Sequence, residues 1–92
     1  MREFLAKRRG DVLRRAITTL ETCSPAELAG EAHRLAGTLG IFGFDDASTA
    51  LRGLQRAAEA PDVPVDEIDR QRMRTLAMLR GIEDSAISEE PG

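Results

Sequence analysis

A helical period runs through the stretch Glu31-Ala-His-Arg-Leu-Ala-Gly-Thr-Leu-Gly40. An α-helix turns by about 100° per residue, and this rotation sorts residues 26–40 onto three faces. The first face is apolar and is typical of a helix packed on a core: Leu28, Ala32, Leu35 and Leu39. The second face is polar: Glu27, Glu31, Arg34 and Thr38. The third face surrounds His33 with small residues, so we expect a single presented imidazole: Ala26, Ala29, Gly30, Ala36, Gly37 and Gly40.

Helical periodicity covers the rest of the chain, and no segment alternates apolar and polar residues as a strand does. Apolar stripes at helical spacing occur in three further segments: Leu13, Ala16, Ile17 and Leu20; Leu51, Leu54 and Ala58; Ile68, Leu76, Leu79 and Ile82. Start and stop signals predict helices over about residues 2–22, from Ser24-Pro25 to about 40–43, from Asp45 or Asp46 to about 60, and from Asp66 to about 84.

Four amphipathic helices with short connections pack most simply as an antiparallel bundle. We therefore predict an all-α, up-down-up-down four-helix bundle that forms one domain over residues 1–85. Residues 86–92 are small, acidic and end in Pro-Gly, which predicts a flexible C-terminal tail.

The composition excludes several classes of function. The net charge is only −3 and basic residues alternate with acidic ones, so no polybasic surface for nucleic acid or anionic lipid is expected. One cysteine and one histidine do not make a standard zinc site. No apolar run approaches the ~20 residues that span a bilayer, and the first residues lack the pattern of a secretory signal. We expect a cytoplasmic protein with no cofactor or metal of its own.

The segment Ala32-His-Arg-Leu-Ala-Gly37, followed by Gly40 and Gly43, resembles the signature of histidine phosphotransfer (HPt) domains, usually Ala-His-x-Leu-Lys-Gly with later glycines. HPt domains are four-helix bundles that carry a phosphoryl group on one histidine in multistep two-component phosphorelays. The resemblance implies a carrier and not an enzyme, which accepts a phosphoryl group from a receiver or kinase domain and passes it to a response-regulator receiver. The partners it implies are a receiver domain, a hybrid histidine kinase or both, with catalytic aspartates and Mg²⁺ supplied by the receiver and the carrier monomeric.

The resemblance also implies roles for individual residues. His33 is the expected phosphoacceptor, and Gln55 stands where some members have a glutamine that orients the imidazole. Gly37 leaves room for the phosphoryl group, and the small residues around His33 form the expected docking surface, which Phe4 and Leu5 could extend. The family usually has a lysine at the position of Ala36. Arg34 and, secondarily, Arg52 are the candidates to contact the phosphoryl group in its place.

Two other readings stay open. The missing lysine is compatible with an HPt-like adaptor or inhibitor that binds a kinase or receiver surface without using His33. A kinase dimerisation and phosphoacceptor domain is a weaker alternative, since that class typically has an acidic residue after its histidine and Arg34 follows here.

Overall fold

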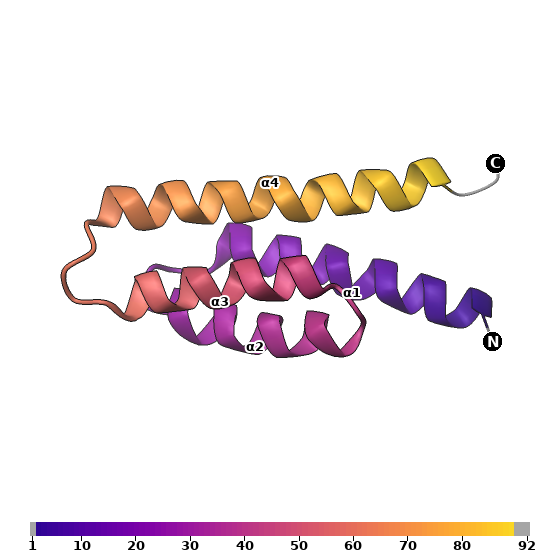
Figure 1. The fold of residues 1–92 in the computed structure, drawn as a ribbon, viewed down its shortest axis with the longest axis horizontal. Helices are drawn as coiled ribbons and strands as arrows, with labels where there is room; N and C mark the ends of the chain where they lie inside the picture. The colour runs from indigo at the N-terminus through magenta and orange to yellow at the C-terminus, as the bar shows by residue number, and fades with distance from the viewer. Residues whose placement is uncertain (1, 90–92) are drawn as a thin grey trace.

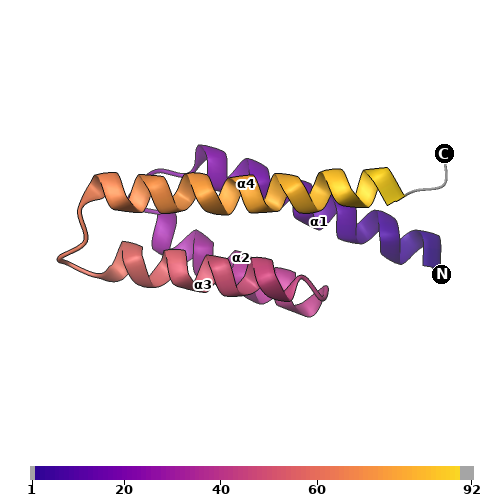
Figure 2. The same cartoon turned by 45° about the horizontal axis from the view of Figure 1, so that its top comes forward.

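The computed structural model describes residues 2–89, with side chains described over residues 7–85. Four helices follow one another in this part of the chain, and it contains no strand: α1 (Arg2–Thr22), α2 (Leu28–Ile41), α3 (Asp45–Glu59) and α4 (Val65–Glu89). Successive helices run in opposite directions (Figures 1 and 2). The predicted all-α four-helix bundle is confirmed.

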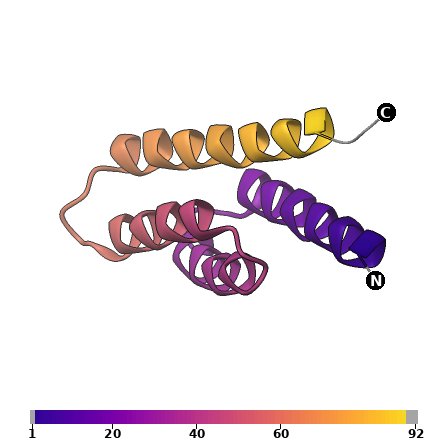
Figure 3. The ribbon, with the colours of Figure 1, turned by 45° about the vertical axis from the view of Figure 1, so that its right-hand side comes forward.

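The helices form a closed ring of contacts in which α1 packs on α2, α2 on α3, α3 on α4 and α4 on α1. The contact between α2 and α3 is the most extensive of these. Because α1 and α4 are the long helices, the first part of α1 and the last part of α4 continue past the turn that joins α2 to α3 (Figures 1 and 3). The bundle is accordingly elongated, at 46 × 20 × 20 Å.

The core is built from the predicted apolar stripes. Leucines fill most of it, and alanines let the helices approach closely. Its buried members are Leu13, Ala16, Ile17, Leu20, Leu28, Ala32, Leu35, Ala36, Leu39, Ala47, Leu51, Leu54, Leu76 and Leu79. Ala58, Ile68 and Ile82 pack against this core while staying half-buried.

Small and polar residues bring α2 and α3 together. The buried Ser48 hydroxyl of α3 donates a hydrogen bond to the Ala36 carbonyl of α2 at 2.8 Å. A Cβ added to Gly40 would lie 3.3 Å from the Ser48 oxygen, tighter than ordinary contact. The absence of a side chain at Gly40 therefore allows the close approach that positions α3 beside the face of α2 that carries His33.

The starts of α2 and α3 differ in detail from the prediction. The Ser24 backbone N–H donates to Glu27 Oε1 at 3.0 Å, which is half of the predicted capping box, but residues 25–27 form a turn and α2 begins only at Leu28. The cap of α3 is Phe44, and no side chain caps it. Asp45 and Asp46 occupy its first turn instead, where their negative charges interact favourably with the positive end of the helix dipole.

The turn between α2 and α3 closes one end of the core. Gly43 adopts φ +86°, a left-handed conformation that glycine reaches without steric cost. Phe44 packs against the core, and the guanidinium carbon of Arg9 lies 4.7 Å from the centre of its ring. The Nε–H of Arg9 also donates to the Phe42 carbonyl at 3.1 Å, so α1 holds this turn in place.

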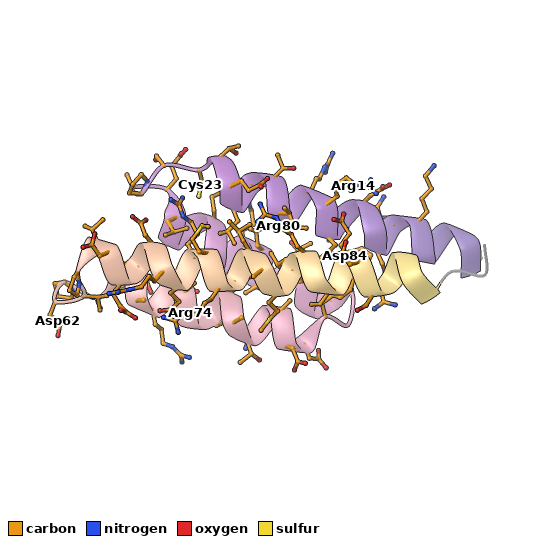
Figure 4. All side chains as sticks on the ribbon, turned by 90° about the horizontal axis from the view of Figure 1, so that it is seen from above. Arg14, Cys23, Asp62, Arg74, Arg80 and Asp84 are labelled. Atoms are coloured by element: carbon orange, nitrogen blue, oxygen red, sulfur yellow. The ribbon has the colours of Figure 1, made fainter. Side chains whose placement is uncertain are left out.

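Helix α4 is longer than predicted at both ends. It begins at Val65 and continues to Glu89, so residues 86–89, which were predicted as part of the tail, are helical instead, and residues 90–92 lie outside the described part. No proline lies between Val65 and Glu89 to interrupt this helix. Ion pairs of Arg80 with Glu21, and of Arg14 with Glu83 at 3.7 Å, join α4 to α1, and the two helices lie side by side in Figure 4.

Candidate functional site

His33 lies on α2 at the seam with α3, and its side chain is exposed. Its Nδ1 is 3.2 Å from Oε1 of Gln55 on α3. The prediction that Gln55 meets the imidazole is therefore matched by the geometry. Helical spacing alone places each residue on its own helix, and the close packing of α2 on α3 brings the two side chains together.

This contact fixes the protonation pattern of the neutral imidazole. A carboxamide oxygen can only accept a hydrogen bond, so Nδ1 of His33 carries the proton and donates a hydrogen bond to Oε1 of Gln55. The lone pair then lies on Nε2, the ring nitrogen on the far side from Nδ1. An exposed imidazole with Nε2 unprotonated is a nucleophile, and the hydrogen bond holds its ring in one orientation.

A hollow of about 400 Å³ opens beside the imidazole. We call it the His33 hollow, and it is lined by His33, Ala36, Gly37, Arg52, Gln55 and Arg56. A Cβ added to Gly37 would meet no atom within 4 Å, so this glycine leaves open space next to the ring. The hollow is large enough for a phosphoryl-sized group, and its lining residues include two cations and no carboxylate.

The predicted phosphoryl contact from Arg34 is not supported by the structure. Arg34 forms an ion pair with Glu31 on the polar face of α2 and does not line the His33 hollow. Arg52, the second candidate, does line it. Sequence reasoning missed Arg56, one helical turn after Arg52, although its place next to Gln55 in the chain was a usable signal.

The surface of small residues around His33 is only partly as predicted. Ala26, Gly30 and Gly37 are exposed, whereas Ala29 and Gly40 are half-buried. Ala26 lies in the turn before α2 rather than on the helix. The prediction that Ala36 belongs to the docking surface is wrong. Ala36 is 2% exposed and belongs to the core, because α3 packs over that flank of α2. The side chains of Phe4 and Leu5 lie outside the described residues.

A second hollow, of about 510 Å³, continues along the same seam and shares Gly37 and Arg52 with the first. Its other lining residues are Gly40, Ile41, Asp45, Ser48 and Thr49. Ile41 is 85% exposed. The open surface therefore extends from His33 toward the C-terminal end of α2.

Among the residues whose side chains the structure describes, no three histidine, cysteine, aspartate or glutamate side chains come together so as to hold a metal ion. Among the helices described there, none is both long and apolar enough to cross a membrane. Comparisons with protein-family models, with curated proteins and with solved structures find no significant match to this chain.

Proposed function

We propose that this chain is a histidine phosphotransfer protein, which accepts a phosphoryl group on His33 from a receiver or kinase domain and passes it to a response-regulator receiver. The observation that carries the proposal is the exposed His33 ring, whose Nδ1 is held by Gln55 at 3.2 Å. A histidine that served only in packing needs neither an open face nor a side-chain partner that fixes its tautomer.

The proposed step is a reversible phosphoryl transfer between an aspartyl phosphate and the imidazole. Nε2 of His33 attacks phosphorus, the N–P bond forms, and the P–O bond to the aspartate breaks as the carboxylate leaves. The ring gains positive charge, and its proton on Nδ1 stays hydrogen-bonded to Gln55. Transfer to the next receiver reverses these changes.

Phosphoryl transfer depends mostly on positioning and on electrostatic stabilisation. In this proposal the receiver supplies its catalytic carboxylates and Mg²⁺, and the chain described here supplies the nucleophile. It is then a carrier and not an enzyme, and it has no cofactor of its own. The small residues near His33 favour docking, because a partner can approach closely without immobilising long side chains. We further propose that the carrier is a cytoplasmic monomer and that receiver or hybrid kinase domains are its partners.

The test is phosphoryl transfer from labelled receiver and kinase domains of the same organism to the wild-type chain and to His33→Gln. The proposal predicts label on the wild type that is labile in acid and stable in alkali, and none on the variant. A receiver that binds both proteins equally but labels neither would instead identify an adaptor and refute the carrier.

A further inference from the structure

Arg52 and Arg56 are the only charged side chains that line the His33 hollow. They stand one turn apart on α3, at the outer edge of its seam with α2, and both are exposed. Neither forms an ion pair with a carboxylate of the described residues. Six other arginines in this part of the chain do: Arg14, Arg34, Arg70, Arg72, Arg74 and Arg80.

The α2 side of the hollow has no competing group. Its wall there consists of Ala36, which is buried, and Gly37, which has open space where a side chain would be. Two arginines therefore line an otherwise uncharged space beside the nucleophilic ring. Guanidinium groups suit tetrahedral oxyanions because their fixed N–H donors can bind two oxygens at once.

We infer that Arg52 and Arg56 bind the dianionic phosphoryl group on Nε2 of His33, so that α3 and not α2 supplies the cations. The inference rests on the proposed function for its biological meaning, while the chemistry of the site can be tested without any partner protein. It assigns α3 two tasks. Gln55 orients the ring, and the arginines on either side of it in the helix hold the group that the ring receives.

A second basic hollow shows why the number of arginines alone does not make such a site. A space of about 520 Å³ on α1 is lined by Arg8, Arg14 and Arg15, but also by Asp11. Arg14 pairs with Asp11 at 3.3 Å, and no histidine lines that space. Arg15, which is exposed and lies there, provides a matched control for the loss of one arginine.

The experiment phosphorylates His33 chemically with phosphoramidate. Nε2 attacks phosphorus, the N–P bond forms, and the P–N bond of the donor breaks with release of ammonia. Phosphorus NMR then follows the protonation of the phosphoryl dianion to the monoanion as the pH is lowered. The titration is carried out on the wild type, on Arg52→Gln/Arg56→Gln and on Arg15→Gln. Nearby cations stabilise the dianion, so their loss makes it easier to protonate. The pH at the midpoint should therefore be about one unit higher in the double variant than in the wild type, and Arg15→Gln should match the wild type.

An equal midpoint in the wild type and the double variant overturns the inference, as does failure of phosphoramidate to label His33. Circular dichroism of each variant confirms that the bundle is intact, and single substitutions of Arg52 and Arg56 replace the double variant if it is not. Failure of every receiver to label the wild type refutes the proposed function, yet the NMR titration still decides whether the arginines bind the group. Normal phosphoryl transfer together with an unchanged midpoint would support the proposed function and refute the inference that the arginines bind the phosphoryl group.

Discussion

Nδ1 of His33 lies 3.2 Å from Oε1 of Gln55, and this hydrogen bond joins α2 to α3 at the only histidine of the chain. The same two helices are joined by the hydrogen bond from the Ser48 hydroxyl to the Ala36 carbonyl. Ala36 lines the His33 hollow, so the contact that closes the seam is next to the contact that orients the ring. The orientation of the imidazole therefore depends on the packing of α2 on α3.

Replacing Gln55 with leucine removes the acceptor and keeps a side chain of similar size. We expect phosphoryl transfer to His33 to slow by about tenfold, in the range of other partners that orient a histidine, because the ring loses its fixed tautomer and orientation. Initial transfer rates from a labelled receiver measure the effect. Gln71→Leu, on α4 and outside the hollow, is the control. Equal rates for wild type and Gln55→Leu would show that the hydrogen bond is irrelevant to transfer.

Replacing Gly37 with alanine separates stability from access. The new methyl group meets no atom within 4 Å, and alanine is favoured over glycine in a helix by about 1 kcal/mol, so the free energy of unfolding should rise. Transfer should fall, since the methyl group projects into the space beside His33. Urea denaturation and transfer rates are compared with Gly81→Ala on α4, which also has open space. If both variants transfer like the wild type, Gly37 does not serve access.

Replacing Ser48 with alanine tests the seam between α2 and α3. The variant loses a buried hydrogen bond of 2.8 Å to Ala36, and its free energy of unfolding should fall by about 1 kcal/mol. Thr49→Ala, at the exposed neighbouring position, should change it by less than about 0.5 kcal/mol. Urea denaturation measures both. Equal losses in the two variants would mean that the cross-helix hydrogen bond does not stabilise the bundle.

Glu27 should make the stability of the chain depend on pH. The backbone N–H of Ser24, and then its side chain, hold the pKa of Glu27 below its usual value of 4.5. A pKa lowered in the folded state stabilises the fold above the unfolded value, and this stability is lost as the pH falls through the folded value. Glu27→Gln should therefore be less stable than wild type at pH 7, and the difference should shrink as the pH falls through the folded-state pKa of Glu27. A difference that stays constant as the pH falls would contradict the role of the charge.

Helical periodicity was sufficient to predict the fold because each apolar stripe has a single core to face. Leu13, Leu20 and Leu79 are fully buried as their spacing indicates. Periodicity could not predict that Ala36 is buried, since an alanine beside the apolar stripe suits a solvated surface and a close helix contact equally well. The burial of Ser48 and its hydrogen bond to Ala36 are equally invisible to hydropathy.

The features of the site that depend on a single helix could be predicted from the sequence. Those that depend on how two helices pack together could not. The exposure of His33 follows from its neighbours on α2. The choice between Arg34 and Arg52 depends on the rotation of α3 against α2, and Arg34 pairs instead with Glu31 on its own helix. The end of α4 was misplaced because small and acidic residues suggested a tail, although none of those before Pro91 opposes a helix.

The most direct test identifies which atom carries the phosphoryl group after transfer from a receiver. Nitrogen-15 NMR of the labelled chain distinguishes a phosphoryl group on Nε2 from one on Nδ1. The hydrogen bond from Nδ1 to Gln55 predicts phosphorylation of His33 on Nε2, with the proton retained on Nδ1. A phosphoryl group on Nδ1, on another residue, or nowhere in the chain would contradict the proposal that His33 is an oriented phosphoacceptor.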